Sequence, residues 1–445
     1  MLVISGLLVI AVTYGLTRYG FGLYLPQFRA DLGLSSGVAG GIAASSYLAY
    51  CVAAVVGLRL VDRGRARAAL WGAGLSAAVG SLVVAAAWTT PVLAIGALVA
   101  GSGAGAASPA LVAAVAGTVS PSTEPRSQAV VNSGTGAGVM FGGLVVLAWP
   151  AEWRWAWLGF AGSALLLTWW ADRSASWSSP ADEHDPPSSG VRPRRVAPAL
   201  AAALLAGAGG AGVWTFGRDV MTGSGLSAQV TALLWCLFGG AALLGGLSGS
   251  LVRAAGLTVA WVVSVGVTAA GTVLLAWRPG TVVVAAAALA LFGSGFVAVS
   301  GVLIAWGSRL APEAGAQATA LLFVALTIGQ AAGAVLLGVL TDAAGTSAAF
   351  LTAAGLVSAA AAAAPHRGKF PAPESPVGAR GLARQHSSGG DGRPACAAVA
   401  SGGALPPARQ RVRDDRGEAA TARCAARASR DGAGCQTSAS RGSHT

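Results

Sequence analysis

Charged side chains are scarce in this chain. Asp, Glu, Lys and Arg make up 10% of its 445 residues, whereas an average soluble protein contains about 25%. Hydrophobic residues make up 54%, and the mean hydropathy is +0.64. So little charge excludes a globular protein that faces water over its whole surface. The composition instead predicts a chain that faces lipid over most of its length.

Cysteine and histidine are also few. The five cysteines and four histidines form no CxxC pair and no mixed Cys/His cluster, which argues against a zinc site or a disulfide framework. The sequence shows no catalytic triad and no phosphate-binding loop after a predicted strand. We therefore expect no enzyme, no cofactor, no metal site and no nucleotide-driven pump.

Apolar runs of about 20 residues, the length that crosses a bilayer, recur along the sequence. Ala, Gly, Leu and Val fill these runs without the alternation of a β-barrel, so they predict helices. The expected fold is an all-α membrane protein with twelve transmembrane helices. A signal peptide is the weaker alternative for residues 1–25, because no basic segment precedes the apolar run. The twelve expected spans are 3–25, 38–60, 68–88, 91–117, 127–148, 154–171, 197–220, 228–252, 256–277, 281–306, 315–340 and 347–364.

The arginines in the loops and at the ends of these spans predict the orientation. Eleven lie in loops on the side of the N-terminus. This bias predicts a protein of the plasma membrane with both termini in the cytoplasm. The net charge of +12 does not indicate nucleic acid, because residues 365–445 alone hold 13 basic and 6 acidic residues. The four arginines assigned to outer loops are Arg29, Arg154, Arg218 and Arg278.

Two polar segments divide the chain. Residues 173–196 are rich in Pro and Ser and predict a disordered cytoplasmic linker between residues 1–172 and 197–364. From 365 to 445 the sequence turns to Arg, Ala, Ser, Gly and Pro without periodicity, which predicts a disordered tail. That tail is either a functional cytoplasmic segment or, as we favour, a non-functional extension from out-of-frame coding sequence.

The two halves resemble each other at a constant offset of 192 residues. Residues 101–113 match 293–305 at seven of thirteen positions, and the triplet GLS at 33–35 recurs at 225–227. One offset that satisfies both matches predicts two six-helix bundles related by pseudo-symmetry. Parallel six-plus-six repeats are typical of secondary transporters.

The loop after the second span carries a family motif. "GLRLVDRGRAR" (57–67) resembles the loop 2–3 signature of the major facilitator superfamily, with Gly57, Gly64 and Arg65 in register and Asp62 one place late. The resemblance implies two six-helix bundles, alternating access and a gating role for this loop; a role in topology alone is the alternative. We also expect Asp62 to cap the third helix.

Three further segments suggest a narrower resemblance. Residues 17–26, 43–55 and 132–143 are similar to the YbfB/YjiJ-type branch of the superfamily, which implies no defined substrate. No carboxylate lies clearly inside a predicted span, so the sequence gives no support for proton coupling.

Arg18 is the one charged residue that the sequence places well inside a span. A charge at the centre of a membrane helix costs about 2.5–3.5 kcal/mol on insertion scales, so it calls for a partner or a function. Three interpretations stay open. Arg18 binds an anionic group of the substrate, it extends to the outer surface or pairs with an outer carboxylate such as Asp219, or it lies against an aromatic face. Tyr14 lies one helical turn earlier and shares its face.

Other polar side chains complete the candidate site, because the resemblance implies that helices 1, 4, 7 and 10 line a central cavity. A serine in a membrane helix often bonds the carbonyl four residues earlier, so that role stays open for each serine. Asn132 serves either helix packing or ligand binding. The further candidates for substrate binding are Tyr47, Tyr50, Asn132, Ser102, Ser294 and Trp214.

Glycines spaced by four predict close helix packing. They are Gly134, Gly138, Gly142, Gly329 and Gly333.

The expected function is transport of a small organic solute, either secondary active or facilitative, by a monomer in the lipid bilayer that works by alternating access. The solute is anionic if Arg18 binds it. A drug or metabolite exporter with an apolar cavity lined by Trp214 and Tyr47 is the main alternative, and a non-transporting membrane sensor is another.

Overall fold

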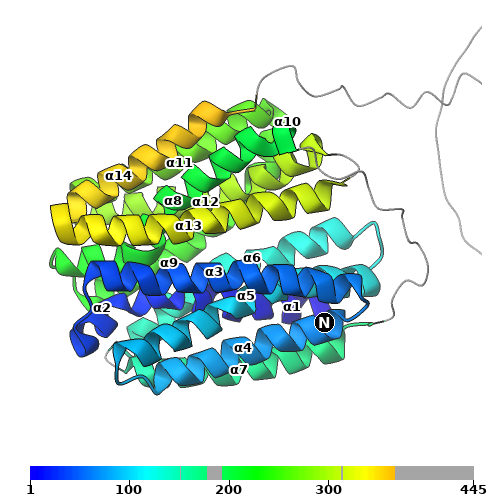
Figure 1. Cartoon of the computed structure of the whole chain (residues 1–445), viewed down its shortest axis with the longest axis horizontal. Helices are drawn as coiled ribbons and strands as arrows, with labels where there is room; N and C mark the ends of the chain where they lie inside the picture. The colour runs from blue at the N-terminus through cyan, green and yellow to red at the C-terminus, as the bar shows by residue number, and fades with distance from the viewer. Residues whose placement is uncertain (151, 178–192, 312–313, 366–445) are drawn as a thin grey trace, which may run out of the picture. The chain divides into compact units, whose positions relative to one another are not determined.

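The computed structural model describes residues 1–150, 152–177, 193–311 and 314–365, and within these ranges every regular element is helical. Helices of the first half run along one side in Figure 1 and those of the second half along the other. The first half comprises α1 (Leu2–Ile10), η1 (Ala11–Arg18), α2 (Gly20–Leu32), α3 (Ser36–Asp62), α4 (Ala66–Ala85), α5 (Thr90–Thr118), α6 (Glu124–Ala148) and α7 (Trp153–Ser174). The second comprises α8 (Pro193–Gly223), α9 (Ala228–Leu244), η2 (Gly245–Leu247), α10 (Ser248–Ala255), α11 (Leu257–Trp277), α12 (Val282–Leu310), α13 (Gly315–Ala344), α14 (Thr346–Ala359) and η4 (Ala360–Ala363).

Eleven helical segments in the described part of the chain are long and apolar enough to cross a membrane. The sixth predicted span corresponds to α7, which has 22 residues, packs against α4 and carries Arg154, Asp172 and Arg173 near its ends. The eleven segments do not include α7. The all-α membrane fold predicted from the sequence is therefore confirmed.

Both halves use the same packing between equivalent helices. In the first half α6 packs along α1 and η1, and in the second α13 packs along α8. Glycines make these contacts close. A Cβ at Gly134 or Gly138 would collide with the backbone of the first span, and one at Gly329 or Gly333 with the backbone of α8. Close backbone contact of this kind is what the four-residue glycine spacing predicts.

Two helix ends differ from the sequence prediction. The first segment continues to Leu32, where Gly33 takes a left-handed conformation at φ 66° and ends it, so Arg29 lies on α2. The assignment of Arg218 to an outer loop was wrong, because α8 continues past it to Gly223. The helix continues there because Arg218 has buried partners and is followed by the buried Met221.

The loop of residues 57–67 forms a tight turn between α3 and α4. Gly64 has φ +69°, and the backbone N–H groups of Gly64 and Arg65 bond the carbonyls of the last turn of α3. Asp62 is therefore the exposed last residue of α3 and does not cap α4, so the predicted cap was wrong. Gly57 lies against Ala106 and Pro109 of α5.

The predicted linker at 173–196 begins and ends within helices, since α7 runs to Ser174 and α8 begins at Pro193. Residues 178–192 between them lie outside the described residues, as does the tail from 366 to 445.

Candidate functional site

Four of the five tyrosines of the chain surround Arg18. Its guanidinium carbon lies 4.0 Å from the ring centre of Tyr50, 5.0 Å from Tyr19, 5.3 Å from Tyr47 and 5.5 Å from Tyr14. These distances fall within the range of cation–π attraction. Arg18 itself is only 5% exposed, so the four rings enclose a buried cation.

A π-helical segment positions this cluster. η1 spans Ala11–Arg18, and at its end the N–H of Tyr19 bonds the carbonyl of Tyr14 five residues earlier, at 3.0 Å. The wider turn lets Tyr14 and Tyr19 both reach the guanidinium of Arg18. Gly15 on this segment lies against the backbone of Gly138 in α6. Single π-turns inside α-helices occur often at functional sites.

The second half of the chain contributes three more side chains. Arg18 Nη2 donates to Gln330 Oε1 at 3.1 Å and to Thr327 Oγ1 at 3.5 Å, both from α13. Trp214 of α8 stacks on Tyr19 with ring centres 3.8 Å apart. Arg18 is thus bonded across the interface between the two halves. We define the Arg18 cluster as the seven residues Tyr14, Arg18, Tyr19, Tyr47, Tyr50, Thr327 and Gln330. Trp214 lies beside this cluster, against Tyr19.

Within the part of the chain that the structure describes, three buried nitrogen atoms at this cluster have no hydrogen-bond partner. They are Arg18 Nε, Gln330 Nε2 and Trp214 Nε1. All three are N–H donors. An unpaired buried donor costs about 1–3 kcal/mol. The cluster therefore has an excess of donors and is chemically suited to a ligand that accepts hydrogen bonds, above all one with a negative charge.

No ion pair within the described residues involves Arg18. Asp219, its proposed outer partner, instead forms a 2.7 Å ion pair with Arg29. Arg18 is also too buried to reach the surface. The interpretation of Arg18 as a residue that pairs with Asp219 or extends to the outer surface is contradicted by this geometry.

Arg218 is a second buried arginine, which sequence analysis placed in a loop. It is 1% exposed. Its Nη1 donates to the carbonyl of Leu23 at 2.5 Å and to Gln27 Oε1 at 2.8 Å, and its Nε donates to Thr231 at 3.3 Å. Like Arg18, it bonds the opposite half through neutral acceptors, but among the described residues no buried nitrogen of Arg218 lacks a partner, whereas Arg18 Nε does.

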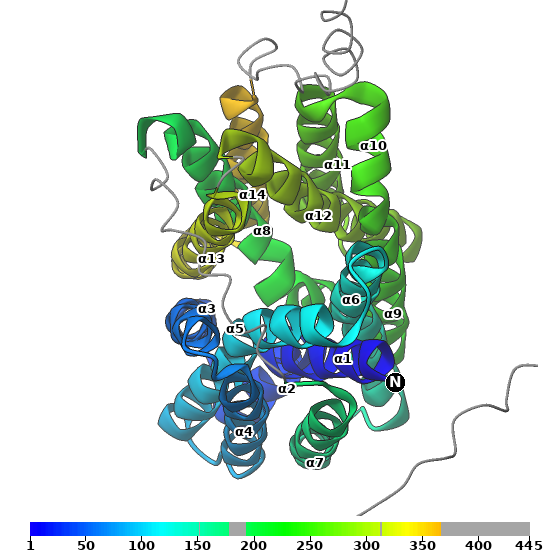
Figure 2. The same cartoon turned by 90° about the vertical axis from the view of Figure 1, so that its right-hand side faces the viewer.

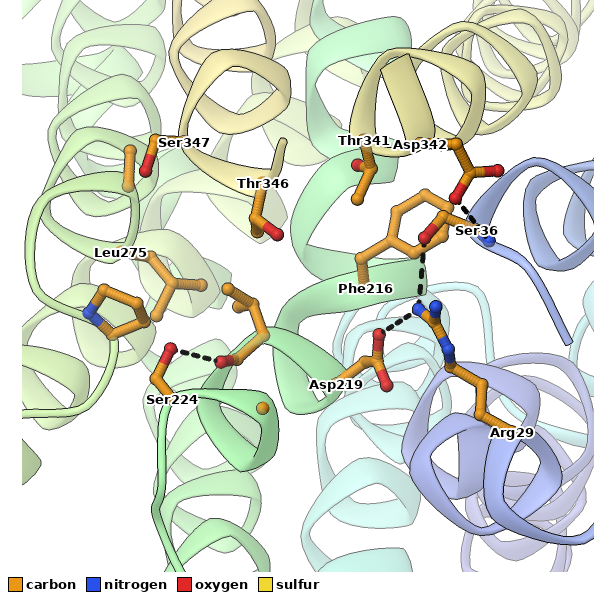
Figure 3. Close-up of a pocket in the computed structure, with 14 residues that line it drawn as sticks. Arg29, Ser36, Phe216, Asp219, Ser224, Leu275, Thr341, Asp342, Thr346 and Ser347 are labelled. Carbon is orange, nitrogen blue, oxygen red and sulfur yellow. Dashed lines mark hydrogen bonds and ion pairs between the residues drawn. The ribbon is translucent and has the colours of Figure 1, made fainter. Parts of the chain in front are cut away.

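Polar contacts between the halves gather near Arg29, at what we call the Arg29 end. Arg29 of α2 pairs with Asp219 of α8. Asp342 of α13 accepts from the N–H groups of Ser36 and Gly37, at 2.9 and 2.6 Å, in the first turn of α3. A carboxylate at a helix N-terminus is favourable for both the bonds and the helix dipole. Figure 3 shows Arg29, Ser36, Asp219 and Asp342 in one pocket of about 600 Å³.

The tyrosine candidates meet in the cluster and bond one another. Tyr14 Oη lies 3.0 Å from Tyr50 Oη and 2.7 Å from Ser108 Oγ. Tyr47 Oη lies 3.4 Å from Thr215 Oγ1 of the second half. These hydrogen bonds fix the rings around Arg18.

The serine and asparagine candidates lie elsewhere. Ser102 and Ser294 donate to carbonyls of their own helices at 2.7 and 2.8 Å, which is the alternative that the sequence left open. Asn132 is exposed and accepts from Gln128 at 3.3 Å. None of the three bonds to the Arg18 cluster in the described residues.

Thr327 and Gln330, which are 2% and 1% exposed, were not predicted from the sequence. A glutamine in an apolar span is a signal of the same kind as Asn132 and could have been noted. The ion pair of Arg67 with Asp172, at 2.8 Å, which joins α4 to α7 next to the loop of residues 57–67, was not predicted either.

Comparison with known families is decisive here. The sequence profile of the Major Facilitator Superfamily matches residues 7–321, well over half of the chain. The chain belongs to the major facilitator superfamily. Its helices, repeat and loop motif agree with this membership, which supports a transmembrane transporter rather than an enzyme.

Solved structures of transporters share the fold. The nucleoside transporter NupG aligns with a TM-score of 0.67 at 14% identity, covering 81% of this chain and 98% of its own. A D-xylose-proton symporter aligns with 0.66 at 13%, covering 81% and 95%. The human organic anion transporter MFSD10 aligns with 0.55 at 18%, covering 81% and 97%. No curated protein matches the sequence. At these identities the likeness concerns the fold alone.

Proposed function

We propose that the protein transports a small organic anion across the plasma membrane by alternating access, and that Arg18 binds the anionic group. The observation that carries this proposal is the buried Arg18, which has four aromatic rings and two neutral acceptors around it and pairs with no carboxylate among the described residues. The unpaired donors at the cluster support an acceptor as the missing partner.

Electrostatics favour an anion at this position. A buried guanidinium loses much hydration energy, and two neutral hydrogen bonds with cation–π contacts recover only part of it. A carboxylate could accept two parallel hydrogen bonds from the guanidinium, the strongest arrangement available to arginine. An uncharged solute would leave the charge uncompensated.

Alternating access requires the two halves to separate at one end at a time. With the N-terminus in the cytoplasm, the Arg29 end is the outer one. The contacts of Arg29 with Asp219 and of Asp342 with α3 would then keep the outer side closed. Residues 1–172 and 197–364 would move as the two bundles, joined by the linker of residues 173–196.

The alternative of an exporter with an apolar cavity shares part of this site. Trp214 and Tyr47, which that hypothesis assigns to the cavity wall, both lie at the Arg18 cluster. The two hypotheses differ in the charge of the solute. Membership of the YbfB/YjiJ-type branch would fit either and remains part of the proposal.

Thermal stability of the purified protein tests the charge of the ligand. We would measure Tm with sodium acetate, lactate and benzoate, and with the matching amides acetamide, lactamide and benzamide. At least one carboxylate should raise Tm while its amide does not, and the rise should disappear in Arg18→Ala. Stabilisation by amides alone, or by none of the carboxylates, would overturn the proposal.

A further inference from the structure

Gln330 is placed where a substrate anion would bind. Its Oε1 lies 3.1 Å from Arg18 Nη2, and its side chain is 1% exposed. A guanidinium has only donors, so Gln330 must direct its oxygen toward Arg18. Its amide nitrogen is buried and has no partner among the described residues. Gln330 therefore accepts a hydrogen bond from Arg18 while its own N–H donors lack an acceptor.

We propose that Gln330 stands in for the substrate anion in the empty transporter and becomes a second ligand-binding residue when the anion arrives. This inference rests on the proposed function. The anion takes over the Arg18 donors, and the amide of Gln330 rotates so that Nε2 donates to the same anion. The terminal torsion of glutamine is broad and two-fold, so the rotation is easy.

The exchange also assigns a specificity role to Gln330. An anion that accepts from Arg18 and from Gln330 satisfies two of the three unpaired donors. A solute without a charged acceptor cannot displace the amide oxygen from the guanidinium without a net loss of binding free energy. Because Gln330 belongs to α13 and Arg18 to η1, the anion would also bridge the two halves.

Gln330→Glu is the sharpest test, because the side chain keeps its size and gains the charge of the proposed anion. The new carboxylate should pair with Arg18 and occupy the site permanently. The Tm of the ligand-free protein should rise, and the stabilising carboxylate of the acetate, lactate and benzoate set should bind about 100-fold more weakly. If Gln330 had only a structural role, Gln330→Glu would not produce both the higher ligand-free Tm and the weaker carboxylate binding.

Gln330→Leu serves as the matched control, since it keeps the volume without acceptor or donor. It should fold, lower the ligand-free Tm and weaken carboxylate binding by about 10-fold or more, the contribution of one hydrogen bond to a charged group. Binding in Gln330→Glu equal to that of the wild type, or a lowered ligand-free Tm in that variant, would overturn the inference.

Arg18→Ala separates this failure from a failure of the proposed function. If Arg18→Ala loses carboxylate binding while Gln330→Glu keeps it, only the stand-in role of Gln330 is wrong. If Arg18→Ala binds carboxylates as the wild type does, the anion site itself is wrong.

Discussion

Two buried arginines illustrate what a charge in a membrane helix can do. Arg218 donates to a carbonyl, an amide oxygen and a hydroxyl that the fold already provides. Arg18 lies amid four aromatic rings, and its Nε has no hydrogen-bond partner in the described part of the chain. The first arrangement is typical of a structural residue, and the second of one whose partner comes from outside the chain. The two arginines should therefore respond differently to mutation.

Replacing Arg218 should weaken the fold rather than ligand binding. Arg218→Ala removes the donor that Gln27 Oε1 and Thr231 Oγ1 share, and the buried Thr231 oxygen loses a bond at a cost of about 1–3 kcal/mol. We expect a lower ligand-free Tm and an unchanged shift with carboxylate. Arg253→Ala, which removes an exposed arginine, is the control and should change neither value. Loss of the carboxylate shift in Arg218→Ala, with the fold intact, would contradict this division.

Close helix packing between α6 and the first span depends on glycine. A methyl group on Gly138 would overlap the carbonyl of Ala11, and the backbone there cannot move without shifting η1. This contact supports the π-helical segment that positions Arg18. Packing at this element therefore affects both stability and the site.

Gly138→Ala should lower Tm and weaken carboxylate binding, because η1 must shift to relieve the overlap. Gly162→Ala is the matched control, since a Cβ at Gly162 of α7 would meet no atom within 4 Å. Its Tm should equal that of the wild type or exceed it slightly. Equal Tm for both variants in a thermal melt of the purified protein would refute the packing argument.

Features that follow from residue spacing within one helix could be predicted from the sequence, whereas features that depend on contacts between distant segments could not. The spacing of Gly134, Gly138 and Gly142 indicated a packing face, and the isolated Arg18 indicated a special site. The π-turn was not predictable because it depends on contact with α6. The place of Arg218 inside α8 was missed because an Arg-Asp pair resembles a helix end, while its partners Leu23 and Gln27 lie about 190 residues away in sequence. A role for Gln330 could be inferred only from the structure, where its side chain on α13 bonds Arg18 at the end of η1.

At the scale of the whole molecule, the two halves meet at the Arg29 end through charges held by both. Figure 2 shows the helices of the first half and those of the second on opposite sides of the molecule. If the two halves move as proposed, contacts that cross between them, such as Asp342 with the N-terminus of α3, must break when this end opens. The strength of these contacts would then determine how often the end opens.

Asp342→Ala should favour opening at the Arg29 end. We would introduce Thr215→Cys, at a side chain that is 1% exposed, into a protein whose five native cysteines are replaced. Labelling of this cysteine from outside by a membrane-impermeant maleimide should be several times faster with Asp342→Ala. Asp31→Ala is the control, because Asp31 bonds Trp153 and Arg154 within the first half. Equal labelling in both variants would show that Asp342 does not hold this end closed.

Solute flux in proteoliposomes tests the central claim most directly, since it joins the anion site to transport. Uptake of the carboxylate that stabilises the purified protein would be compared in the wild type, Arg18→Ala and the control Arg253→Ala. The account predicts uptake in the wild type and in Arg253→Ala, and uptake at least about 10-fold slower in Arg18→Ala, the loss expected for one hydrogen bond to a charged group. Equal uptake with and without Arg18, or no carboxylate uptake by the wild type, would contradict it.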